Sequence, residues 1–181
     1  MKIRLSLLLT ILIISTAIVS SCGQKFPVPA GNNEGILVIP QRTTNNTKSN
    51  KFAYNYYIKY HPETPVKIRI VPSISKDFYI FENFPAGTYQ ITSLESFGIS
   101  NNSIMAGRRG SRSEYVYKSY FEIKPNQITV LNRRLTISKI KLDGTYSRQN
   151  WSFFYLDESE KQEITDKLKQ LENVNLWTFY E

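Results

Sequence analysis

The residues best suited to hold a ligand form a short basic segment, Ala106–Ser113, with the sequence Ala-Gly-Arg-Arg-Gly-Ser-Arg-Ser. Arg108, Arg109 and Arg112 are interspersed with glycine and serine, so guanidinium and backbone N–H groups can both face an anion. The segment lacks the ending and spacing of a nucleotide-binding P-loop. It is a candidate site for a phosphate or carboxylate, and the alternative is a solvated loop. Further basic residues that the fold could bring near it are Lys118, Arg133, Arg134, Lys139 and Lys141.

Catalytic and metal-binding patterns are missing from the sequence. The single histidine, His61, precedes Pro62 at a predicted strand end, a position more typical of a surface side chain than of a catalytic base. One histidine cannot form a multi-histidine metal site. The acidic residues Asp157, Glu158 and Glu160 lie at the start of a predicted helix, where negative charge is favourable. We therefore predict no catalytic residue, no metal site, no cofactor and no enzymatic activity.

The only cysteine, Cys22, follows an apolar run from Leu5 to Val19. A basic start, an apolar stretch of about 15 residues and small residues before the cleavage point are typical of a secretory signal peptide. The segment Val19-Ser20-Ser21-Cys22 resembles the lipobox of bacterial lipoproteins, which implies that the cysteine is acylated and becomes the new N-terminus. The alternatives are an uncleaved anchor, for which a span usually needs about 20 apolar residues, and a buried structural cysteine. By the same resemblance, Gly23 after the cysteine implies delivery to the outer membrane.

These features divide the chain into a signal peptide over residues 1–21, a tether over residues 22–34 and one domain over residues 35–181. The tether is predicted because Pro27, Pro29 and nearby glycine occur with little periodicity.

The mature chain carries a moderate positive charge. Cleavage removes Lys2 and Arg4 and no acid, which leaves 160 residues with 21 basic and 15 acidic side chains and a formal charge of +6. This length suits one domain with a sizeable core. The charge suits contact with phospholipid headgroups or acidic glycans, and equally an ordinary domain. Nucleic acid is not an expected partner of an exported, anchored chain.

Alternation of apolar and polar residues predicts short strands through most of the domain. The clearest is Val66–Ile70, which lies between two prolines. Turns are expected at Pro85–Thr88, where Gly87 can adopt a positive φ, at Pro125-Asn126 and at Asp143-Gly144. The predicted strands are 35–40, 51–61, 66–70, 78–81, 89–94, 115–123, 128–137 and 151–155, and a long polar excursion covers 96–113.

The C-terminal part has helical periodicity. Ile164, Leu168 and Leu171 fall on one helical face, and Ser159 with Gln162 has the spacing of a capping box. We expect an amphipathic helix over about residues 160–172 that docks through this narrow stripe.

Tyrosine is abundant, with 12 residues. Most are expected to be structural, because aromatic side chains suit sheet surfaces and sandwich cores. Tyrosines on an outer face would instead favour contact with a carbohydrate or a protein. The tyrosines concentrated on two predicted strands are Tyr54, Tyr56, Tyr57, Tyr60, Tyr115, Tyr117 and Tyr120.

Two segments carry a family resemblance. Phe81–Ile91 contains an apolar residue followed by the motif Pro-x-Gly-x-Tyr, at Pro85, Gly87 and Tyr89. This segment resembles the strand-turn-strand of transthyretin-like and carboxypeptidase-regulatory-like domains. Phe121–Leu131 is similar to the following segment in small bacterial lipoproteins with such a domain, except that Asn126 replaces the usual glycine. The resemblance covers residues 35–137. It implies a mainly β fold, an antiparallel Ig-like or transthyretin-like β-sandwich, here with a C-terminal amphipathic helix.

Such sandwiches host adhesion, scaffolding and binding alike, so the resemblance does not select a ligand. The sequence predicts a non-enzymatic binding or scaffolding protein of the bacterial cell envelope, anchored to the membrane through Cys22, with an envelope protein or glycan as its partner. The alternative is a binder of anionic lipid headgroups or acidic glycans that uses Arg108, Arg109 and Arg112.

Overall fold

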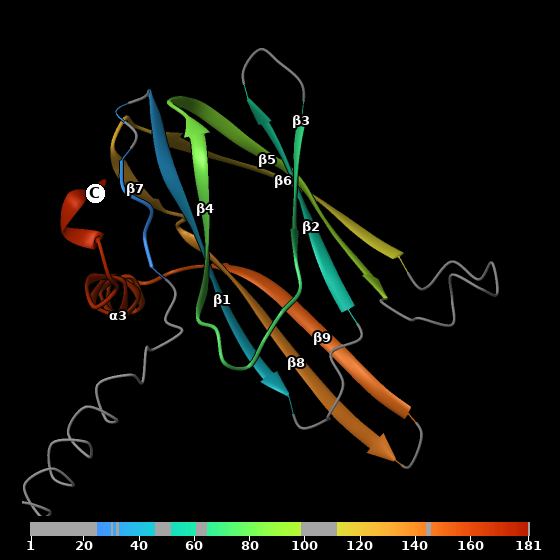
Figure 1. Cartoon of the computed structure of the whole chain (residues 1–181). Helices are drawn as coiled ribbons and strands as arrows, with labels where there is room; N and C mark the ends of the chain where they lie inside the picture. The colour runs from blue at the N-terminus through green and yellow to red at the C-terminus, as the bar shows by residue number, and fades with distance from the viewer. Residues whose placement is uncertain are drawn as a thin grey trace, which may run out of the picture.

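The computed structural model describes residues 25–29, 31, 33–45, 52–60, 65–98, 112–143 and 146–180, and its fold is mainly β (Figure 1). No helix in these ranges is long and apolar enough to cross a bilayer. The elements are β1 (Glu34–Asn45), β2 (Phe52–Tyr60), β3 (Pro65–Ile70), β4 (Phe78–Pro85), β5 (Gly87–Gly98), β6 (Arg112–Ile123), β7 (Gln127–Val130), β8 (Arg133–Asp143), β9 (Tyr146–Tyr155), α3 (Glu158–Lys169), the 3-10 helix η1 (Val174–Leu176) and β10 (Thr178–Tyr180).

The strands form two sheets. The smaller sheet has the order β3-β2-β5-β6, and all its pairings are antiparallel, as expected. The larger sheet is mixed, which corrects the expectation of a purely antiparallel sandwich. Its strand β1 pairs antiparallel with β4 but parallel with both β7 and β8, and β10 also runs parallel to β7. The reason is that the whole smaller sheet lies between β1 and β7 in the sequence, and a long connection permits parallel pairing.

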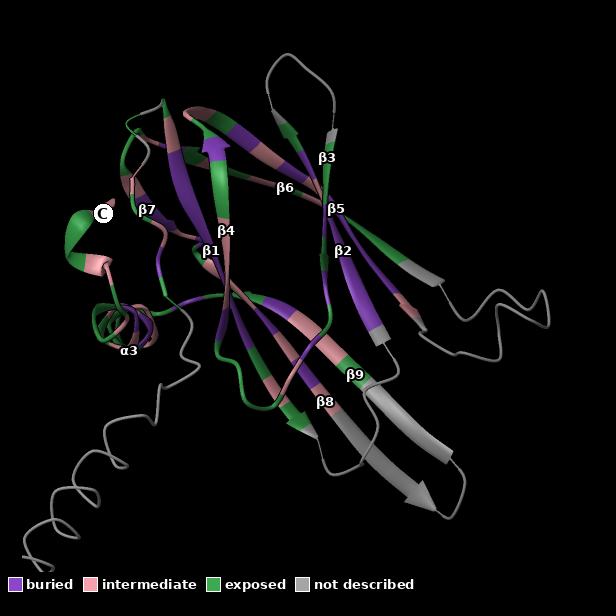
Figure 2. Cartoon of the chain, in the orientation of Figure 1, coloured by how far each residue is buried: buried purple, intermediate pink, exposed green. Residues whose placement is uncertain are grey.

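The chain packs in three layers, with the mixed sheet in the middle (Figures 1 and 2). Leu37 and Ile39 of β1 face the four-stranded sheet and belong to the core between the sheets. Ile36 and Val38 point the other way, into a second core that α3 covers. Because both faces of β1 are buried over residues 36–39, this part of the strand is a continuous apolar run instead of an alternation.

Two residues of the predicted tether, Phe26 and Pro27, pack against the domain. Phe26 is fully buried in the second core. Its backbone N–H donates to the Glu172 carbonyl at 3.0 Å, its carbonyl accepts from Asn173 Nδ2 at 3.1 Å, and Trp177 Nε1 donates to the Pro27 carbonyl at 2.8 Å. A single docked aromatic residue has no periodicity, so the sequence pattern could not show it.

The predicted amphipathic helix near the C-terminus is confirmed, but it begins and ends at other residues than predicted. α3 covers Glu158–Lys169 instead of 160–172, and Ile164 and Leu168 are its buried residues. Its N-cap is Asp157, whose carboxylate accepts from Glu160 N at 2.7 Å in a capping box with Glu160, and not the Ser159 pair that the spacing suggested. Asp157, two residues before Ser159, forms the same kind of reciprocal pair with Glu160, so the helix begins sooner.

Two predicted turns, at Gly87, which opens β5, and at Asn126 before β7, are confirmed, and one predicted strand is divided into two. Gly87 has a positive φ of 155° and Asn126 has φ 56°, as expected for these turns. The predicted strand over 128–137 is divided by Leu131 and Asn132 into β7 and β8. The Leu131 N–H still donates to the Val38 carbonyl at 2.9 Å, so the line of contact with β1 continues through the break.

The buried hydroxyl of Tyr56 destabilises the core between the sheets. Its side chain is fully buried, and its hydroxyl has no hydrogen-bond partner among the described residues. Burial, with smaller contributions from Tyr54 and Tyr117, raises the pKa of Tyr56 well above its ordinary value of 10.0. The folded protein therefore keeps this phenol neutral at a pH where an unfolded chain ionises it.

We expect Tyr56→Phe to stabilise the protein by about 1 kcal/mol, because it removes an unpaired polar group from the core. Above pH 10 the stability of the wild type should fall as the pKa of the unfolded tyrosine is passed, and the variant should fall less steeply. Denaturant unfolding at pH 7 and pH 10.5 measures both effects. Tyr89→Phe is the control, since the Tyr89 hydroxyl donates to the Pro85 carbonyl at 2.7 Å. Equal destabilisation by the two changes would contradict the unpaired state of Tyr56.

Candidate functional site

Aromatic side chains close one open side of the sandwich, where the edge strand β6 faces the edge strand β9. The rings of Tyr115 and Trp151 meet edge to face with centroids 4.4 Å apart, and those of Tyr117 and Phe153 are 5.2 Å apart. Tyr115 remains 48% exposed. This side of the sandwich is therefore joined by ring contacts and presents aromatic surface to the outside.

Arg133 lies at the end of this aromatic row. It pairs directly with Tyr155 across the β8–β9 ladder, and its guanidinium carbon is 3.7 Å from the Tyr155 ring centroid. The Phe153 and Tyr117 ring centroids are 5.5 and 5.9 Å away. Tyr155 itself is 64% exposed. The group Tyr115, Tyr117, Arg133, Trp151, Phe153 and Tyr155 is called the arginine–tyrosine site below.

The charge of Arg133 has no acidic partner in the described part of the chain. Its Nη1 donates to the Phe153 carbonyl at 3.3 Å, and its buried Nε has no partner there. The next residue, Arg134, forms an ion pair with Glu160 of α3. Successive strand residues point to opposite faces, which explains why one arginine is neutralised by the helix and the other is left among aromatic rings.

Tyr117 is held in its neutral form, in which its hydroxyl can donate a hydrogen bond. Burial raises the pKa of Tyr117, although the nearby Arg133 charge lowers it in part. A guanidinium fork can hold a carboxylate or phosphate through paired hydrogen bonds. Exposed ring faces can pack against the apolar faces of a sugar or another flat group. The arrangement can therefore bind an anionic, partly apolar ligand.

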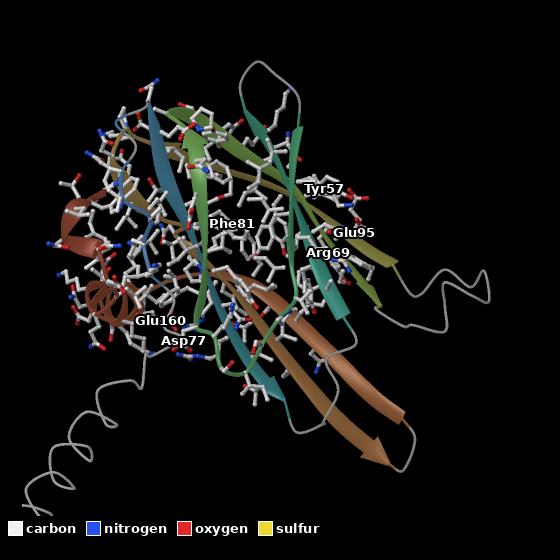
Figure 3. The ribbon with its side chains drawn as sticks, in the orientation of Figure 1. Tyr57, Arg69, Asp77, Phe81, Glu95 and Glu160 are labelled. Carbon is white, nitrogen blue, oxygen red and sulfur yellow. The ribbon has the colours of Figure 1, made fainter. Side chains whose placement is uncertain are left out.

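A second polar cluster lies on the outer face of the four-stranded sheet, where Figure 3 shows Tyr57, Glu95 and Arg69 together. Glu95 is 5% exposed, and its Oε2 accepts from Asn55 Nδ2 at 2.9 Å and from the Tyr57 hydroxyl at 2.6 Å. Arg69 pairs with Asn55 across the β2–β3 ladder and stacks on the Phe97 ring at 5.0 Å. Because its carboxylate is held by donors of the same sheet, this cluster braces the sheet surface. The strand predicted over 51–61 includes Asn55 and Tyr57, but no pattern in the sequence indicated Glu95.

The residues singled out in the sequence are only partly covered by the structure. Cys22, His61, Arg108 and Arg109 lie outside the described residues. Arg112 opens β6 opposite Phe97 of β5, and its side chain is likewise not described.

Two of the residues named for a basic patch do not share a surface, and the side chains of Lys139 and Lys141 lie outside the described residues. Arg133 and Arg134 point to opposite faces of β8, so they cannot face a common ligand. Within the described residues, no group of three or more histidine, cysteine, aspartate or glutamate side chains is placed to hold a metal ion. The arginine–tyrosine site was not predicted, because its members come from three strands and meet only across the sandwich.

Comparison with protein-family models, with curated proteins and with solved structures finds no match for this chain.

Proposed function

We propose that this protein is a lipid-anchored, non-enzymatic binding protein of the bacterial cell envelope, delivered to the outer membrane, and that its arginine–tyrosine site holds an acidic glycan. The observation that supports the ligand is Arg133, whose guanidinium is stacked on an exposed tyrosine and lacks an acidic partner among the described residues. The neighbouring Arg134, in contrast, is paired with Glu160 of α3.

The chemistry of the site favours an acidic sugar over a bare ion. The guanidinium supplies the charge for a carboxylate or phosphate, and Tyr155 supplies exposed ring surface beside it. Tyr115, which packs on Trp151, adds exposed ring surface at another point of the same row. The formal charge of +6 on the mature chain would favour the approach of a polyanion.

The same proposal includes the finer fold assignment. The turn between β4 and β5, with Pro85, Gly87 and Tyr89, supports a transthyretin-like arrangement, and the Tyr89 hydroxyl donates back to the Pro85 carbonyl across it. The mixed pairing of β1 means that any such kinship concerns the hairpin and the four-stranded sheet, not the full strand order.

We expect Arg133→Gln to weaken binding of polygalacturonate, a uronic acid polymer, about 30-fold, since a charge-assisted hydrogen-bonded contact contributes about 2 kcal/mol. Tyr155→Ala should weaken it as well, because the stacking partner of the guanidinium is lost. Titration calorimetry of the purified protein in detergent micelles measures both changes in affinity. Raising the salt concentration should weaken binding by the wild type.

Arg69→Gln is the matched control, because it removes one exposed positive charge from the outer sheet face. If the change does no more than remove one positive charge away from the site, the affinity should stay within about twofold of the wild-type value. Equal losses in the Arg69 and Arg133 variants would show that binding depends on net charge and not on the arginine–tyrosine site.

The basic segment is a second candidate. Arg112 begins the same strand that carries Tyr115 and Tyr117, so the segment joins β6 at the end nearest Tyr115. If this segment binds the anion instead, replacing Arg108, Arg109 and Arg112 together with alanine should abolish binding while Arg133→Gln leaves it intact.

The lipid anchor has its own test. We expect Cys22→Ser to abolish incorporation of a fatty-acid analogue and to leave the precursor uncleaved, because the acylated sulfur is lost. Metabolic labelling in a Gram-negative host measures this, and fractionation locates the wild type. Equal labelling of both proteins would refute acylation at Cys22, and recovery of the wild type in the inner membrane would refute outer-membrane delivery.

A further inference from the structure

The docked position of Phe26 limits how far the domain can lie from its lipid anchor. Phe26 is fully buried beside α3, and three hydrogen bonds hold it and Pro27 to the C-terminal segment. Only three residues separate Phe26 from Cys22. Even when fully extended, the chain between these two residues spans about 14 Å. A domain tied so closely cannot turn freely above the membrane.

The surface around the docked segment has a composition that suits a lipid interface. Val28 is 67% exposed and Leu176 is 47% exposed, although both are aliphatic. Trp177 is partly buried and lines one small hollow together with Val28. Lys25 is exposed at the start of the segment. Tryptophan is enriched at membrane interfaces, and lysine is attracted to anionic headgroups. We call Lys25, Val28, Leu176 and Trp177 the anchor-proximal face.

We propose that the anchor-proximal face rests on the phospholipid surface, held there by the short chain between Cys22 and the docked Phe26. This inference depends on the lipid anchoring proposed above. In this orientation the layer that contains α3 lies nearest the membrane, and the four-stranded sheet lies farthest from it (Figure 1). The arginine–tyrosine site, between the two sheets, stays open to a ligand from the surroundings.

The two tryptophans of the chain report on this orientation separately. Trp177 belongs to the anchor-proximal face, and Trp151 packs between Tyr54 and Tyr115 in the core between the sheets. Mature, acylated Trp151→Phe and Trp177→Phe proteins are reconstituted in phosphatidylcholine–phosphatidylglycerol vesicles that contain a headgroup-nitroxide lipid. We expect the nitroxide to quench Trp177 severalfold more strongly than Trp151. Equal quenching would overturn the proposed orientation.

A longer connection tests whether the short chain sets the orientation. Ten glycine and serine residues are inserted between Gly23 and Gln24 of the Trp151→Phe protein, outside the docked segment. Quenching of Trp177 should fall to the level of Trp151, and unchanged quenching would overturn the proposal.

Fatty-acid labelling and vesicle flotation of each protein report on the anchor independently. An unlabelled protein that does not float refutes the lipid anchoring. A labelled, floating protein with equal quenching of both tryptophans refutes only the orientation.

Discussion

Gly35→Ala should destabilise the protein by about 3 kcal/mol, at the upper end for overpacking a core. A Cβ at this position would lie 2.5 Å from the Lys124 carbonyl oxygen, 2.7 Å from Ile123 Cγ2 and 3.0 Å from the Gln127 carbonyl oxygen. Two of these atoms are backbone, so they cannot move away as a side chain can. The turn is also tied to β1 at this point, since Asn126 N donates to the Glu34 carbonyl at 2.9 Å. Denaturant unfolding measures the loss.

Gly31→Ala is the matched control for this change. Gly31 has a φ of +74°, but a Cβ there would meet nothing within 4 Å. Its substitution should cost about 1 kcal/mol, from backbone strain alone. If the two alanine variants lose equal stability, the close approach of β1 to the turn is not what requires glycine at position 35.

Phe26→Ala should cost about 3 to 4 kcal/mol, the usual range for a fully buried phenylalanine, and lower the melting temperature by about 10 °C. The side chain fills the core between α3 and the mixed sheet with Ile36, Ile164 and Leu168. A flexible tether would give no such effect. Thermal unfolding of the mature protein followed by circular dichroism measures it.

Val28→Ala provides the comparison, because this side chain is two residues away and 67% exposed. It should change stability by less than about 0.5 kcal/mol. A Phe26 variant as stable as the Val28 variant would show that residues 25–29 do not belong to the folded domain in solution.

Local patterns predicted the elements well where one face of a strand or helix is polar. The alternation over Val66–Ile70 became β3, and Ile164 and Leu168 became the buried stripe of α3. The turn residues Gly87 and Asn126 have the positive φ that their types suggested. These features depend on a few neighbouring residues, so the sequence alone determines them.

The candidate site could not be predicted in the same way. Tyr117, Arg133 and Tyr155 come from three strands and meet because β6 and β9 face each other across the sandwich. Tyrosines on a predicted strand suggested a contact surface, but no local pattern shows which ring an arginine will stack on. The basic segment Ala106–Ser113, in contrast, is visible in the sequence because its arginines lie close together along the chain.

By itself, the sequence determined the mainly β character, the amphipathic helix near the C-terminus and the turns at Gly87 and Asn126, because hydrophobic periodicity and backbone preference act over short stretches. The tertiary structure alone decided the parallel pairing of β1, the burial of Phe26 and the different surroundings of Arg133 and Arg134. Each of these depends on contacts between segments that are distant in the sequence. β1 pairs with strands far along the chain, and Phe26 fills a space between α3 and the sheet. Alternation along β8 directs Arg133 and Arg134 to opposite faces, and the tertiary structure decides what covers each face.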